Sequence, residues 1–110
     1  MPAQAIIRAG ACGFTTTVQV KGDDPQALTL VIASDCPKVR SVAWTAGRME
    51  GIDAYAEMDP SGTSPLRQQV AKLPTACCVG CVVPSGILKA MQAGAGMLLP
   101  AESRIELSVG

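Results

Sequence analysis

Histidine is absent from the 110 residues of this chain. Without an imidazole, the chain can support neither Cys–His proteolysis nor Ser–His–Asp hydrolysis. Any bound metal ion must also be held by other side chains. The absence of histidine therefore excludes both hydrolytic mechanisms and any imidazole metal ligand.

Aromatic residues, net charge and long apolar runs are scarce as well. Aromatics make up 3% of the chain, and nine basic residues balance nine acidic ones without any Lys or Arg run. Such a composition offers neither stacking platforms nor a basic surface for nucleic acid. No apolar run reaches the ~18 residues of a membrane span, and the start of the chain lacks the features of a signal peptide. We therefore expect a cytoplasmic protein that binds neither nucleic acid nor membrane.

An aliphatic core is what the composition does provide. Apolar residues make up 48% of the chain, which is enough for one domain over residues 1–110. Apolar and polar residues alternate in three early segments that short turns separate, which predicts an antiparallel meander. The three predicted strands cover residues 3–9, 14–21 and 27–34.

Helices are predicted after the meander, because proline at a first helical position favours a helix start. The predicted starts are at Pro37, Pro65 and Pro84, with a further short helix over residues 52–58. A last strand is expected after Pro100, where apolar and polar residues alternate again. Segregated strands and helices predict a two-layer α+β domain: a three-stranded meander plus a C-terminal strand, with helices packed on one face.

The five cysteines are the most informative residues that are present. They are Cys12, Cys36, Cys77, Cys78 and Cys81. An odd number in a cytoplasmic chain suits ligands or redox groups better than a disulfide framework. Cys12 and Cys36 each follow a strand, and strands one and three of a meander run in the same direction. Both thiols should therefore lie at one edge of the sheet, and the Cys77–Cys81 loop could fold over that edge.

Four converging thiols would hold an iron–sulfur cluster or a zinc ion, since both accept four thiolates. The expected cofactor ligands are Cys12, Cys36, Cys78 and Cys81, with Cys77 as an alternate metal ligand. Structural zinc usually takes two Cys-x-x-Cys pairs, and this chain has one. That count favours an iron–sulfur cluster slightly and leaves zinc open.

The cysteine spacing resembles that of the U-type iron–sulfur scaffold family (NifU amino-terminal or IscU-like domain). The resemblance rests on Ala11-Cys12-Gly13, on Cys36 at the first helix, and on Cys77-Cys78 ahead of the last long helix. It implies a sheet covered by helices and a role as cluster scaffold or carrier, with iron–sulfur assembly or sulfur-transfer proteins as partners. The chain departs from the family at Phe14, where the family has aspartate, and at Cys77, where it has histidine. Cys81 is an addition, so we expect a tighter, all-thiolate site.

Two other interpretations of the cysteines remain open. Cys78 and Cys81 lie close to a predicted helix start, whose partial positive charge favours thiolates, so they could serve thiol redox chemistry or sulfur carriage. Alternatively, the cysteines are incidental core residues of a non-catalytic domain. No catalytic residue is identified, which favours a binding protein over an enzyme. The last strand, as a sheet edge, could also pair between chains in a homo-oligomer.

Overall fold

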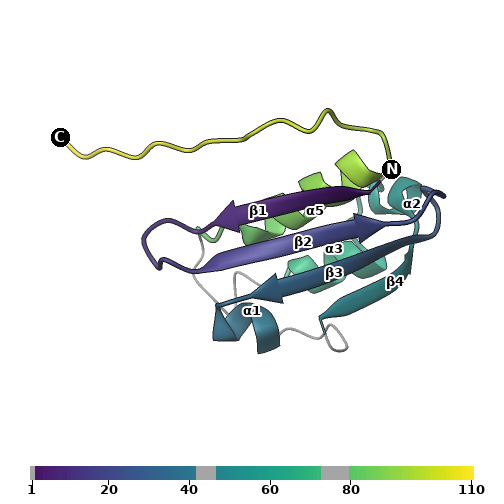
Figure 1. Ribbon diagram of the computed structural model, residues 1–110, viewed down its shortest axis with the longest axis horizontal. Helices are drawn as coiled ribbons and strands as arrows, with labels where there is room; N and C mark the ends of the chain where they lie inside the picture. Colours follow the sequence, from purple (N-terminus) through teal and green to yellow (C-terminus); the bar gives the residue numbers. More distant parts are fainter. Residues whose placement is uncertain (1, 42–46, 73–79) are drawn as a thin grey trace.

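The structure is a computed structural model that describes residues 2–41, 47–72 and 80–110. Its strands form one antiparallel sheet in the order β1-β2-β3-β4 (Figure 1). The strands are β1 (Ala3–Arg8), β2 (Thr15–Lys21), β3 (Leu28–Ser34) and β4 (Arg48–Ile52). The helices are α1 (Pro37–Ser41), α2 (Ala54–Glu57), α3 (Pro65–Val70) and α5 (Val83–Gly94). The α+β class expected from the sequence is confirmed.

The three-stranded meander lies where the alternating pattern predicts it. In β2, Thr16, Val18 and Val20 are buried, while Gln19 and Lys21 between and after them are exposed. Successive side chains of a strand point to opposite faces, so this alternation allows only one face to meet the core. The register of β2 against β1 and β3 is therefore fixed by its own sequence.

The prediction of a C-terminal strand after Pro100 is wrong. Residues 99–110 form no helix or strand, and all of them are exposed. The fourth strand is instead β4, which pairs antiparallel with β3 through an irregular register between Leu28 and Leu30. The alternation after Pro100 supplies the side-chain pattern of a strand, but a strand also needs a partner edge for its backbone.

β4 carries little strand signal in its own sequence. Its residues read Arg-Met-Glu-Gly-Ile, and Ile52 is the one buried residue among them. Context decides such a segment, because β propensity chiefly reflects packing against neighbouring strands. The helix predicted over residues 52–58 is shorter, running over Ala54–Glu57.

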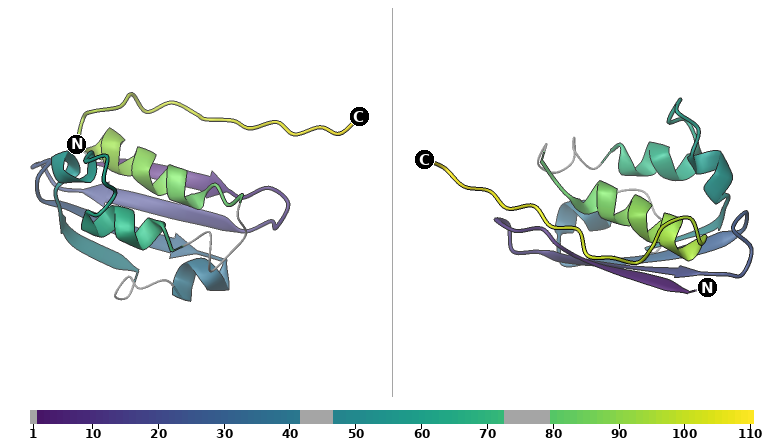
Figure 2. Two further views of the ribbon diagram at one scale, coloured as in Figure 1. Left: turned by 180° about the vertical axis from the view of Figure 1, so that it is seen from behind. Right: turned by 90° about the horizontal axis from the view of Figure 1, so that it is seen from above.

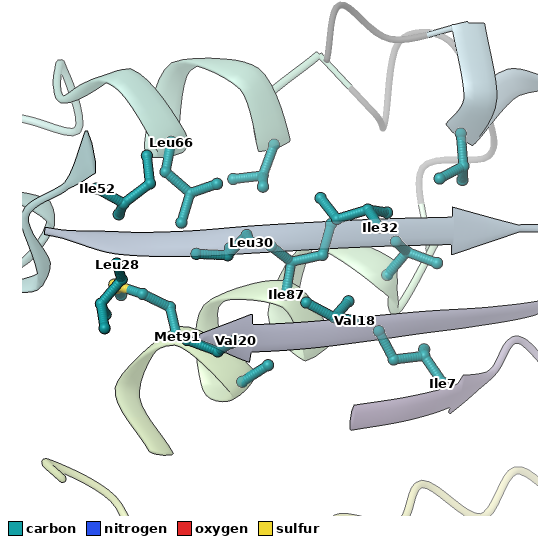
Figure 3. Packing of buried hydrophobic residues seen from close by; sticks show 14 of the residues in the cluster. Ile7, Val18, Val20, Leu28, Leu30, Ile32, Ile52, Leu66, Ile87 and Met91 are labelled. Carbon is teal, nitrogen blue, oxygen red and sulfur yellow. The ribbon is translucent and has the colours of Figure 1, made fainter. Parts of the chain in front are cut away.

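The described helices lie on one face of the sheet (Figure 2). Apolar side chains from both layers meet between them, and Figure 3 shows Leu30 and Ile87 near the centre of this cluster, with Met91 beside Leu28 and Val20. Almost all of the buried side chains are aliphatic. Within the described residues, no helix is long and apolar enough to cross a membrane.

Helix α5 packs unusually close to the sheet. Side chains are absent at Gly86 and Gly94, and a Cβ at these positions would collide with the side chains of Ile7 and Val20 respectively. Ile7 lies near the end of β1, whereas Val20 pairs with Ala3 at its beginning. Helix α5 therefore runs antiparallel to β1, and its first turn lies at the end of the sheet where β1 finishes.

Candidate functional site

Cys12 lies in the hairpin loop that joins β1 to β2, and it is exposed. The loop is closed by bonds from the Gly13 N–H to the Gly10 carbonyl at 2.9 Å and from the Ala9 N–H to the Phe14 carbonyl at 3.1 Å. Both glycines have positive φ angles, 81° and 74°, which other residues adopt at a cost. The loop thus holds the Cys12 thiol in solvent beyond the end of β1.

Cys36 lies between β3 and α1, and it belongs to the buried core with 6% of its surface exposed. Its backbone N–H donates to Ser34 Oγ at 3.1 Å. Ser34 Oγ in turn lies 2.7 Å from Thr16 Oγ1 on the neighbouring strand. The thiol is therefore placed at the end of β3 by a hydrogen-bonded chain that reaches into the sheet.

Cys81 lies two residues ahead of α5 and is half-buried. It packs against the edge of the core cluster. Because α5 runs antiparallel to β1, Cys81 lies at the end of the sheet where β1 and β3 finish. The antiparallel order also makes β1 and β3 run in the same direction, as the meander predicts.

Three cysteine-bearing segments therefore reach the same end of the sheet. They are the β1–β2 hairpin, the β3–α1 junction and the segment before α5 (Figures 1 and 2). The environments of the thiols differ: Cys36 is buried, Cys81 half-buried and Cys12 exposed. Cys77 and Cys78, which the sequence also nominates as ligands, lie outside the described residues.

Sharing one end of the sheet does not by itself make a metal centre. Across residues 2–41, 47–72 and 80–110, no three Cys, Asp or Glu side chains form a group that could hold a metal ion. Thiolates suit zinc and iron–sulfur clusters chemically. A complete centre here would thus require thiols beyond those of Cys12, Cys36 and Cys81.

The hydroxyl pair of Thr16 and Ser34 was not predicted from the sequence. Thr16 is buried at 1% exposure, and its oxygen is satisfied by Ser34. The signal was present, since Thr16 shares the apolar face of its strand with Val18 and Val20. A hydroxyl on a buried face requires a partner, and the partner here also fixes the backbone of Cys36.

Comparison with known proteins identifies the family of the chain. Residues 3–107 match the model of a family of unknown function (DUF6951), so the chain belongs to that family. Neither a curated protein nor a solved structure matches the chain.

Proposed function

We propose that this member of the DUF6951 family binds an iron–sulfur cluster or a zinc ion through cysteine thiolates at the end of the sheet where β1 and β3 finish. The proposed ligands are Cys12, Cys36, Cys78 and Cys81, with Cys77 as an alternate. One observation carries the proposal: three segments far apart in the chain bring their cysteines to this one end. Cys77 and Cys78 stand four and three positions before Cys81 in the sequence and would supply the thiols that the described residues lack.

The burial of the thiols supports a site with a protected inner side and an open outer side. Cys36 and Cys81 contact the apolar core, which would shield bound metal and sulfide from water. Cys12 stands in solvent on its hairpin. An exposed ligand is accessible to an incoming thiol. This accessibility suits a scaffold or carrier that exchanges its cluster or metal ion with assembly or sulfur-transfer proteins.

The composition of the core favours a metal that is bound for function over a metal that is needed for folding. The described core is aliphatic, and it is assembled by β-strand pairing and by α5. A structural zinc ion is typical of small domains that cannot fold without it. We therefore expect the metal-free protein to be folded, and we place it in the reducing cytoplasm, where thiols remain available as ligands.

Anaerobic reconstitution tests the proposal directly. The protein, purified without oxygen, is treated with ferrous iron and sulfide and examined by visible absorption and by iron, sulfide and zinc analysis. Charge-transfer absorption with stoichiometric iron and sulfide supports a cluster, and one equivalent of tightly held zinc supports the zinc alternative. Binding of neither would contradict the proposal. A reversible disulfide between Cys78 and Cys81 in the same metal-free sample would favour redox chemistry instead.

Single alanine variants then assign the ligands. Replacing Cys36 or Cys81, or Cys77 and Cys78 together, should abolish stoichiometric binding, and replacing Cys12 should weaken it and speed release of the metal. Cys77→Ala is the matched control, because it removes a thiol beside Cys78 and should keep binding intact. Circular dichroism of each metal-free variant separates the loss of a ligand from the loss of the fold. Equal effects of all five substitutions would contradict the assignment.

A further inference from the structure

The segment that follows α5 is extended and has no partner within the described chain. Figures 1 and 2 show it leaving the end of α5 and running out past the other elements. It exposes large apolar side chains, including Leu107 at 92% and Ile105 at 70% of their surfaces. Exposed apolar side chains that form a contiguous patch often mark a site of protein–protein interaction.

The segment already has the two faces of a strand. Ile105, Leu107 and Val109 alternate with polar residues, which places them on one face of an extended chain. On the other face, Arg104 pairs with Glu102 at 3.1 Å and with Glu106 at 3.8 Å. Ion pairs between residues two apart are the geometry of a strand face. The segment thus offers one apolar face, one charged face and unpaired backbone groups.

The sheet has an edge that matches it. β1 pairs with β2 on one side, and no described strand pairs with its other side. Its register is uninterrupted from Ala3 to Arg8, whereas the opposite edge, β4, is short and irregular. Irregular edges resist strand addition, and regular ones invite it. β1 is therefore the acceptor edge that this sheet presents.

The two faces of β1 suit an added strand of this pattern. On the helix face, Ala3 and Ala5 are small and half-buried against the core, so they leave room beside them for larger side chains. On the open face, Arg8 is the charged residue of β1. It would lie on the same side as the carboxylate of Glu106 in the added strand. An added strand would turn its apolar face towards the flank of α5 and its charged face towards solvent.

We propose that residues 103–109 of one copy add as a fifth strand to the outer edge of β1 in a second copy. Within one chain, this segment remains extended and does not pair with β1, so both backbone edges are left unsatisfied. Each copy has one donor segment and one acceptor edge, so a reciprocal exchange satisfies both and closes at two copies. The family match extends to residue 107, so most of the donor segment belongs to the matched region.

Sedimentation equilibrium of the full chain tests the exchange, in the presence of a reductant and a chelator. These conditions exclude dimers linked by disulfides or by shared metal, so the result is independent of the metal-binding proposal. The expected mass is twice that of the chain, and removal of residues 103–110 should halve it. Leu107→Asp should also give monomers, while Ser108→Asp, one residue away on the other face, should keep the dimer. Because Leu107 is exposed in the single chain, its substitution cannot unfold the monomer.

Hydrogen exchange distinguishes the possible partners of the segment. In the proposed dimer, the amides of β1 and of residues 103–109 are protected together, and both lose protection in Leu107→Asp. A monomeric full chain with unprotected residues 103–109 would overturn the proposal. A monomer whose residues 103–109 are protected would overturn it too, because the segment would then pair with β1 of its own chain.

Discussion

The hydroxyl oxygens of Thr16 and Ser34 lie 2.7 Å apart, on neighbouring strands that lead to the buried Cys36. Ser34 Oγ also accepts the backbone N–H of Cys36. These two contacts connect the hydrogen bonding of the sheet to the position of the candidate ligand. The pair therefore affects the stability of the sheet and, through the backbone of Cys36, the proposed metal site.

We expect Ser34→Ala to lower the free energy of unfolding by about 1–3 kcal/mol, because it leaves the buried Thr16 hydroxyl without a partner. Thr16→Val combined with Ser34→Ala should cost less than the sum of the single changes, since both polar groups are then removed. A double-mutant cycle by urea unfolding measures the coupling. Additive effects would show that the two hydroxyls do not interact.

Among the described residues, Glu57 should be the carboxylate whose removal lowers the free energy of unfolding the most. It is 3% exposed and accepts bonds from Ser64 Oγ at 2.8 Å, the Leu66 N–H at 3.0 Å and the Arg67 N–H at 2.9 Å. It thus caps the start of α3 from outside that helix. Glu57→Ala should cost about 2–4 kcal/mol, because two helix N–H groups and a hydroxyl lose a charged acceptor.

Glu50→Ala is the matched control for Glu57. Its carboxylate pairs with Arg48 at 2.9 Å but is exposed, so its loss should change the free energy of unfolding by less than about 1 kcal/mol. Thermal unfolding of the two variants compares the sites. Similar losses would contradict the capping role of Glu57.

The glycines of α5 should not tolerate a methyl group. Alanine is normally better in a helix by about 1 kcal/mol. Gly86→Ala should nevertheless destabilise the protein by about 1–3 kcal/mol, because its Cβ would overlap the side chain of Ile7. Ser85→Ala, on the exposed side of the same turn, should be neutral within about 0.5 kcal/mol. If Gly86→Ala raised the free energy of unfolding, this would contradict the close packing of α5 against Ile7 of β1.

Thiol labelling should follow burial. In the native, metal-free protein, the exposed Cys12 should react with a thiol reagent before the half-buried Cys81, and the buried Cys36 should react last. Mass spectrometry of peptides after timed quenching ranks the three rates. In denaturant the order should disappear. A rapidly labelled Cys36 in the folded protein would contradict its place in the core.

Acid stability should depend on Asp59. The pKa of this carboxyl lies below its ordinary value of 3.8, chiefly because the Ser61 backbone N–H donates to it at 2.9 Å. A depressed folded pKa stabilises the protein above the unfolded pKa, and this contribution is lost as pH falls through the folded pKa. Asp59→Asn should therefore flatten the acid side of a urea-midpoint profile below about pH 5. An acid side that is the same in Asp59→Asn as in the unaltered protein would contradict this contribution.

The meander could be predicted because its information is local. Alternation in residues 14–21 sets both the strand and its buried face, and the glycines of the first turn mark where this strand begins. The shared end of Cys12 and Cys36 followed from strand direction alone. The same local rule failed after Pro100, where the alternation is as clear but the single chain provides no paired edge.

Contacts between distant segments could not be predicted. β4 is a strand because β3 offers it an edge, and its own residues give little sign of this. The close approach of α5 depends on Gly86 meeting Ile7, a pairing that sequence spacing does not specify. The position of Cys81 depends on that approach.

The antiparallel course of α5 over β1 also implies an order of assembly. Each strand pairs with its neighbour along the chain, so the sheet can form from contacts between nearby segments. Helix α5 must then return from the far part of the chain to the first strand, a contact of large sequence separation. Cys12 and Cys36 can therefore reach their places before Cys81 does. A metal ion or cluster held by all three thiols would bind only after this last docking step. Its binding would then stabilise the packing of α5 on the sheet.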